Sequence, residues 1–261
     1  MSSNQASISA NLTNADELID RVSSFGPKYN PVPVAFTIAG LTQLKTSAET
    51  LVNNAKTAEN VWKNSTSARS LIFDGADGLV TRAYNAYSIS GATEQSIRQA
   101  ESKVHAYRNE RVSDKPTEEE KAAAKAEGKE LKTNVQHNAT FDKKAENFGD
   151  FVDFLDNSGI YGPNEADISI AGLTARHEEM KSNNKICSQN AIELDKARML
   201  RDTVMFSKGT GLVDVSLGVK TYVKSAFGIT SVQYKSISGL KFKNIKKINN
   251  PDQVEQPEPV R

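Results

Sequence analysis

The chain has few cysteines, few aromatic residues and no long hydrophobic run, and each of these shortages excludes a class of protein. A single cysteine, Cys187, excludes an internal disulfide. Aromatic residues make up 7% of the sequence and hydrophobic residues 38%. This apolar content is enough for narrow apolar stripes on helices but low for a thick sheet-based core. No window approaches the ~20 apolar residues that span a bilayer, so we expect no membrane segment. We therefore expect a helical protein with a modest core.

Neither sign of charge predominates. Thirty-three basic residues nearly cancel 32 acidic residues, and the formal net charge is +1. Global charge therefore favours neither a nucleic-acid binder nor a binder of acidic partners. The first residues lack the basic start and apolar run of a secretory signal, so we expect a cytoplasmic location.

An internal repeat is the strongest pattern present. Tyr29, Pro31 and the run Ile38–Thr42 match Tyr161, Pro163 and the run Ile170–Thr174 at one constant offset of 132 residues. Arg69 falls on Arg201 at the same offset. Later landmarks, Gly-Leu-Val and Gly-x-Thr, recur in the same order after short insertions. The series predicts two tandem copies of one helical unit, residues 1–112 and 145–248.

Each copy is predicted to contain one long helix, over residues 34–73 and 164–206, with Tyr-x-Pro at its first turn. Residues spaced alternately three and four apart, from Leu41 to Ile72 in the first copy and from Leu173 to Val204 in the second, form a heptad seam, typical of a coiled coil. The seam is mostly apolar or small in the first copy and more polar in the second. Glycine clusters at 74–78 and 207–211 predict turns into shorter return helices over 79–89 and 212–227. Thr93 and Thr230 are the expected caps of the segments that follow. The fold class is thus all-α: an elongated helical bundle of two homologous units.

Two further segments differ from the copies. Residues 113–144 are rich in Ala, Glu and Lys and begin with a capping box, which predicts an exposed charged connecting helix. The tail, 249–261, is polar and proline-rich, which predicts disorder unless a partner orders it.

Arg69 and Arg201 occupy seam positions where apolar residues are expected. A charge there must be paired or partly solvated. The favoured interpretation is an ion pair with a carboxylate on a neighbouring helix, which would fix the register of the copies. The alternative is an anion-binding site between the copies, which would suit an enzyme.

The end of the second copy is basic and aromatic. Between residues 220 and 247 there is no acidic side chain. Lysines could meet phosphates there while Tyr222, Phe227, Tyr234 and Phe242 stack on bases. The competing interpretation places the aromatics in the core and the lysines on a solvated face. The candidate nucleic-acid contacts are Lys220, Lys224, Lys235, Lys241, Lys243, Lys246 and Lys247.

No pattern predicts a metal, a cofactor or a catalytic group. His105, His137 and His177 are scattered, and His177 lacks the second histidine of a metalloprotease helix. Cys187 lies on the seam, which predicts a buried small residue rather than a reactive thiol. The residues thus favour a non-enzymatic structural or protein-interaction protein that uses long helical faces, with a protein partner or self-association. Nucleic-acid binding is the alternative, and an enzyme or anion site between the copies is a weaker one.

The Tyr-x-Pro and Ala-Gly-Leu-Thr opening, together with the closing pattern from Tyr222 to Phe242, resembles a group of uncharacterised bacterial helical proteins. The resemblance covers most of the second copy and, more weakly, the first. It implies the repeat and no particular activity.

Overall fold

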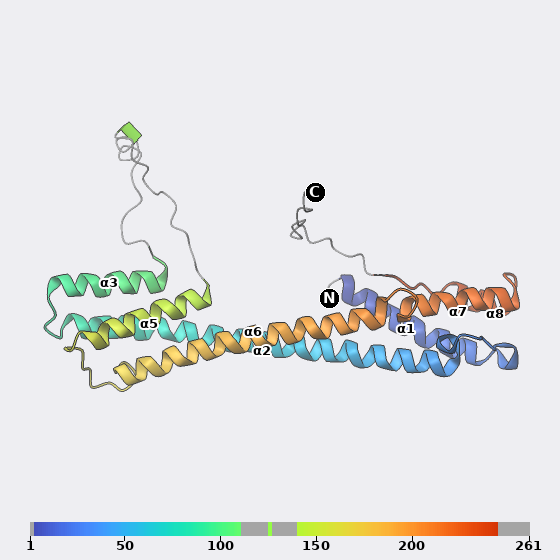
Figure 1. The fold of residues 1–261 in the computed structure, drawn as a ribbon, viewed down its shortest axis with the longest axis horizontal. Helices are drawn as coiled ribbons and strands as arrows, with labels where there is room; N and C mark the ends of the chain where they lie inside the picture. The colour runs from blue at the N-terminus through green and yellow to red at the C-terminus, as the bar shows by residue number, and fades with distance from the viewer. Residues whose placement is uncertain (1–2, 111–124, 127–139, 245–261) are drawn as a thin grey trace, which may run out of the picture. The chain divides into compact units, whose positions relative to one another are not determined.

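A computed structural model describes residues 3–110, 125–126 and 140–244. Within these ranges the chain forms helices and no strand, as the sequence predicts, and no described helix is long and apolar enough to cross a bilayer. Figure 1 shows the principal helices. They are α1 (Ser3–Ser23), α2 (Ile38–Ser88), α3 (Glu94–Arg108), α5 (Phe141–Asn157), α6 (Ile170–Phe206), α7 (Leu212–Phe227) and α8 (Val232–Ser238), with 3-10 turns at Gly26–Lys28 and Val34–Phe36.

The chain divides into two compact units. Unit 1 contains residues 1–59 and 193–261, and unit 2 contains residues 60–192. These units are a different division of the chain from the two predicted copies. Each unit takes the opening of one copy and the closing part of the other.

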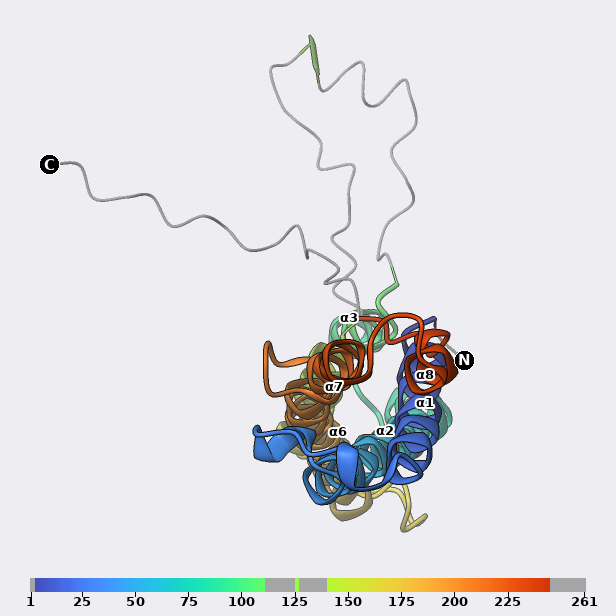
Figure 2. The ribbon, with the colours of Figure 1, turned by 90° about the vertical axis from the view of Figure 1, so that its right-hand side faces the viewer.

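Unit 1 is built on two neighbouring clusters of buried side chains. Leu18 and Val22 of α1 pack with Leu41 of α2, with the valine face of α7 and with Ile237 of α8. The second cluster joins α1 to Ala48 and to the junction of α6 with α7. Helices α1, α7 and α8 contact one another, and Figure 2 shows them side by side.

Unit 2 has a single core to which four helices contribute. Helix α2 supplies Phe73 and Tyr87, α3 supplies Tyr107, α5 supplies Phe148 and α6 supplies Met180, all at most 2% exposed. The Tyr107 hydroxyl donates to the carbonyl of Phe73 at 3.3 Å, which ties α3 to α2. The rings of Tyr107 and Phe148 meet edge to face, 5.7 Å apart.

The matched openings of the two predicted copies share a tyrosine hydrogen bond and a close backbone approach at a glycine. The Tyr29 hydroxyl donates to the Phe36 carbonyl at 2.5 Å, and the Tyr161 hydroxyl donates to the Ile168 carbonyl at 2.6 Å. The glycine of each Ala-Gly-Leu-Thr run is needed because a Cβ there would lie 2.2 Å from the backbone oxygen six residues earlier. That close approach turns the chain into the long helix.

The predicted heptad seam faces inward on both long helices. All of its residues are buried or half-buried, and one residue per heptad is nearly inaccessible from Leu41 to Ala55 and from Leu173 to Leu194. In the second copy that residue is successively Leu173, Met180, Cys187 and Leu194. The prediction that Cys187 is a buried small residue is thus confirmed, at 3% exposure.

The predicted break at residues 74–78 is wrong, because α2 continues through Gly75 and Gly78 to Ser88. Its continuation buries Ala76, Val80, Ala83 and Tyr87 in the core of unit 2. A helical glycine costs about 1 kcal/mol, whereas fully burying one valine, such as Val80, gains about 1.5–3 kcal/mol, and Tyr87 is buried as well. Packing therefore outweighs propensity. The matching break at 207–211 is correct, since α6 ends at Phe206 and Gly209 has φ +77°.

Two smaller predictions are wrong. Neither Pro31 nor Pro163 opens a long helix, because α2 begins at Ile38 and α6 at Ile170, after the turn that each tyrosine fastens. The cap of α8 is Ser231, one residue after the predicted Thr230, and its hydroxyl accepts from the Tyr234 N–H. Thr93 caps α3 as predicted. The tail and most of the predicted connecting helix lie outside the described residues.

Candidate functional site

The basic end of the second copy is used largely for packing. Tyr222, Phe227, Tyr234 and Phe242 all pack against the cores of unit 1. The Tyr222 hydroxyl also accepts from the Asn30 N–H at 3.1 Å. Aromatic faces already occupied by protein side chains are not free for stacking on bases, so this arrangement favours the core interpretation.

The lysines of this stretch do not act alike. Lys220 Nζ donates to the carbonyls of Ser238 and Leu240, at 3.0 and 2.6 Å, and burial lowers the pKa of its ammonium group. It therefore anchors the chain after α8. The backbone of Lys243 is held by Asn11 at 2.8 and 2.9 Å. The side chains of Lys224, Lys235, Lys241 and Lys243 are exposed, while Lys246 and Lys247 lie outside the described residues.

The two seam arginines belong to different units and have different contacts. The Arg201 guanidinium pairs with Asp202, its neighbour on α6, at 2.7 Å. The Arg69 guanidinium lies over the ring of Phe141, 4.1 Å from its centroid, and among the described residues its Nε has no hydrogen-bond partner. The structure thus gives Arg69 an aromatic partner where a carboxylate was expected. An anion site shared by both arginines stays a prediction.

The two histidines in the described ranges have different partners. His105 Nδ1 lies 3.0 Å from a carboxylate oxygen of Glu110, and His177 lies on α6 against Phe148. His137 is outside the described residues. Within the described ranges no three His, Cys, Asp or Glu side chains are placed to hold a metal ion.

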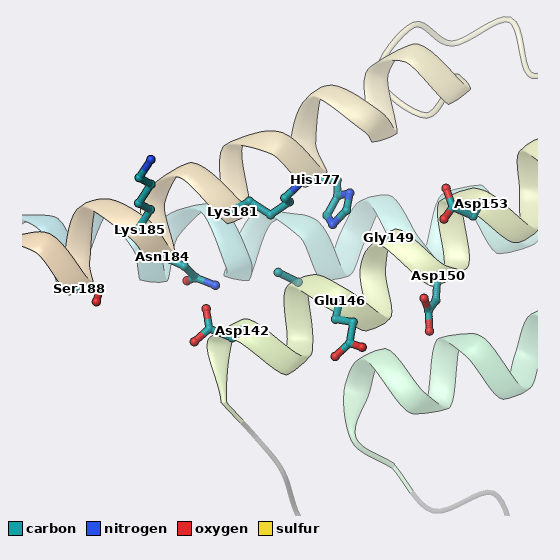
Figure 3. Close-up of a pocket in the computed structure, with 11 residues that line it drawn as sticks. Asp142, Glu146, Gly149, Asp150, Asp153, His177, Lys181, Asn184, Lys185 and Ser188 are labelled. Carbon is teal, nitrogen blue, oxygen red and sulfur yellow. The ribbon is translucent and has the colours of Figure 1, made fainter.

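The candidate site is a polar groove of about 560 Å³ between α5 and the first half of α6, entirely within unit 2 (Figure 3). Four carboxylates of α5 line one wall: Asp142, Glu146, Asp150 and Asp153. Because they are spaced four, four and three residues apart, they share one face of the helix. The α6 wall carries His177, Lys181, Asn184, Lys185 and Ser188.

Local sequence shapes the floor of this groove. Gly149 is buried where α5 passes α6, and a Cβ there would lie 2.5 Å from the His177 ring. The glycine thus lets the imidazole approach the α5 backbone closely. Thr140 caps α5 by accepting from the Lys143 N–H, which places Asp142 in the first turn. A carboxylate in the first turn of a helix is stabilised by the helix dipole.

Asn184 is the least satisfied polar side chain of the groove. Only 8% of the residue is exposed, and its Oδ1 has no hydrogen-bond partner among the described residues. Figure 3 shows the amide extending from α6 toward Asp142. Leaving a buried acceptor unpaired costs about 1–3 kcal/mol, a cost that a bound ligand could remove.

Few ion pairs involve the acidic wall. Glu146 pairs with Lys143 on its own helix at 2.8 Å, and Asp150 lies 3.9 Å from Lys103 of α3. Lys181 pairs with Glu178, also on its own helix. The charges of the two walls are therefore not joined by any ion pair between described residues. The groove was not predicted from the sequence, although the row of acids at helical spacing was a readable signal.

No family model matches the chain, and neither a curated protein nor a solved structure matches it significantly. The resemblance noted from the sequence stays a prediction.

Proposed function

We propose that the protein is a non-enzymatic interaction protein that binds a peptide segment of a partner protein in the groove between α5 and α6. The observation that carries this proposal is the buried Oδ1 of the Asn184 amide, which has no hydrogen-bond partner among the described residues and lines an open groove. A side-chain amide has one donor and one acceptor end, and a peptide group has the same pair. The torsion of a terminal amide is broad, so either end can turn toward the ligand.

The shape of the groove supports the same function. Its walls are helices, which suit the binding of an extended or helical segment along their length. No cluster of catalytic type lines it: the acids lie on one wall and the single histidine is packed on Gly149. We regard binding as a better explanation than catalysis.

We further propose that the chain arose by tandem duplication, and that each compact unit combines parts of both copies. The constant offset of 132 residues supports this proposal, as do the matched tyrosine hydrogen bonds and the matched close approach at Gly40 and Gly172. Helix α1 matches α5 at an offset of 130, because the turn between Phe25 and Tyr29 is two residues shorter than its counterpart. Leu18 and Val22 then fall on Phe148 and Val152, and all four are buried.

Phage display of random peptides on the full chain tests the binding function. Its matched control is the variant Asp142→Leu with Asn184→Val, which places in the groove the residues that the first copy has at the matching positions, Leu12 and Val52. We expect peptides to be enriched on the wild type and not on this variant, while both proteins keep the same circular dichroism spectrum. Equal enrichment on both proteins, or none on either, would refute the proposal.

A further inference from the structure

The matching positions of the first copy show what the groove would look like if it were closed. Leu12 corresponds to Asp142, and Val52 corresponds to Asn184. In unit 1 both residues pack against the same buried cluster, which includes Ala15. In unit 2 the corresponding pair is polar, and it borders open space. The second copy thus forgoes apolar contacts that the first copy makes.

The middle of the groove differs in the same way. Asp16 and Lys45 form an ion pair of 2.6 Å between α1 and α2, and Lys45 has a second partner in Glu49. These hydrogen bonds with Asp16 and Glu49 raise the pKa of the Lys45 ammonium. The corresponding residues of the second copy are Glu146 and His177, which form no ion pair with each other: Glu146 pairs with Lys143 on its own helix, and His177 packs against Phe148. The ion pair that joins α1 to α2 thus has no counterpart between α5 and α6.

Charge then indicates what the groove accepts. Four carboxylates line it against two lysines, and for Asp142 and Asp153 no described residue provides an ion-pair partner. A cation of the ligand placed along α5 would give these carboxylates an ion-pair partner. In the groove the cation would be partly removed from water, and charge-assisted hydrogen bonds are stronger there than in bulk solvent. An anionic ligand would face a wall of like charge, which costs affinity.

We propose that the groove binds a basic peptide segment, with a lysine or arginine side chain along the acidic wall of α5 and a peptide group on Asn184. This proposal rests on the peptide-binding function proposed above, and it adds the charge of the ligand. It is carried by two independent observations, namely the buried Asn184 Oδ1 without a hydrogen-bond partner and the absence, between α5 and α6, of an ion pair like that of Asp16 with Lys45.

Fluorescence anisotropy with three mixtures of labelled ten-residue peptides tests the proposal on the full chain. Two central positions are fixed as Lys, Glu or Ser, and the other positions are randomised over uncharged residues. We expect the Lys mixture to bind at least tenfold more tightly than the other two. Asp142→Asn should weaken its binding severalfold, and 0.5 M salt should weaken it too. The matched control, Asp20→Asn, changes an exposed acid of α1 at the position that corresponds to Asp150, and it should leave binding unchanged.

The outcomes separate the two proposals. If the Glu or Ser mixture binds as tightly as the Lys mixture and Asn184→Val abolishes that binding, the groove binds peptides but the basic class is wrong. If no mixture binds, or if Asp20→Asn weakens binding as much as Asp142→Asn, both the basic class and the groove as a peptide site are wrong. Binding of the Lys mixture that is weakened only by the groove variants supports both proposals.

Discussion

At the scale of single residues, the contact between Gly149 and His177 fixes how closely α5 and α6 approach. The added methyl group of Gly149→Ala would lie 2.5 Å from the imidazole, well inside van der Waals contact. The ring must move for the variant to fold. Overpacking of this kind typically costs about 1–3 kcal/mol, more than the roughly 1 kcal/mol that alanine gains over glycine in a helix.

A double-mutant cycle tests this contact. We expect Gly149→Ala to lower the free energy of unfolding by about 1 kcal/mol in the wild type, and to raise it slightly in a His177→Ala background, where the methyl group has room. Urea unfolding of the four proteins measures the coupling. Strict additivity of the two substitutions would show that the ring does not lie on Gly149.

The two matched tyrosines should make the free energy of unfolding depend on pH in the alkaline range. Burial, together with the nearby Tyr222, raises the pKa of Tyr29 to about 12, and burial and nearby Glu165 raise that of Tyr161 to about 12. An unfolded tyrosine has a pKa of about 10, so between pH 10 and 12 the folded state binds more protons than the unfolded state. The stability that the neutral hydroxyls provide is thus complete below pH 10 and is lost as the pH rises toward 12.

We expect the urea midpoint to fall steeply between pH 10 and 12. Tyr29→Phe combined with Tyr161→Phe should flatten that fall, and at pH 7 each substitution should cost about 1–2 kcal/mol, because each leaves a carbonyl without its donor. Tyr84→Phe serves as a control because Tyr84 is only half-buried and fastens no such turn. A slope that is unchanged in the double variant would contradict the assignment.

At the scale of elements, the sequence predicts the helices better than their ends. Periodicity identifies both long helices and their inward faces, because heptad spacing reflects burial directly. The turn predicted from the glycine cluster at 74–78 is wrong, because glycine indicates a turn only where the buried face of the helix does not continue beyond it. The seam of α2 does continue, from Arg69 to Ala76 and Ala83 at heptad spacing, and both alanines are fully buried. In the second copy the position one heptad after Arg201 is the exposed Lys208, and α6 ends before it, at Phe206.

The candidate site was less predictable than the helices. Its acids share one face of a helix, but most such faces are simply solvated, and the sequence alone cannot show which helix lies opposite. Asn184 belongs to the groove only because α5 packs across α6 at Gly149. That pairing depends on tertiary packing, which periodicity does not encode.

Alanine substitutions distinguish the two glycine clusters. Gly78 lies inside α2 with open space around its Cβ position, so Gly78→Ala should raise the free energy of unfolding by about 0.5–1 kcal/mol. Gly209 has φ +77°, so Gly209→Ala should lower it by about 1–2 kcal/mol. Thermal and urea unfolding report both changes. A destabilising Gly78→Ala would mean that the chain turns at residues 74–78 after all.

At the scale of the whole molecule, the cores connect parts of the chain that are far apart in sequence. The core of unit 1 needs Leu18 near the amino terminus and Val219 of α7, and the core of unit 2 needs Tyr87 of the first copy and Phe151 of the second. Neither predicted copy contains a complete core. A separated copy would expose the apolar face that the other normally covers, and a long helix without tertiary packing is only marginally stable in water.

Separate expression of residues 1–112 and 113–261 tests this dependence. We expect each fragment alone to lose helical signal gradually on heating, without a cooperative transition. An equimolar mixture should recover most of the circular dichroism signal and the sharp transition of the intact chain, because both cores can then form from the two pieces. The transition temperature of the mixture should rise with concentration, since association is bimolecular. A fragment that melts cooperatively by itself, independently of concentration, would show that one copy folds alone and that the compact units do not require both.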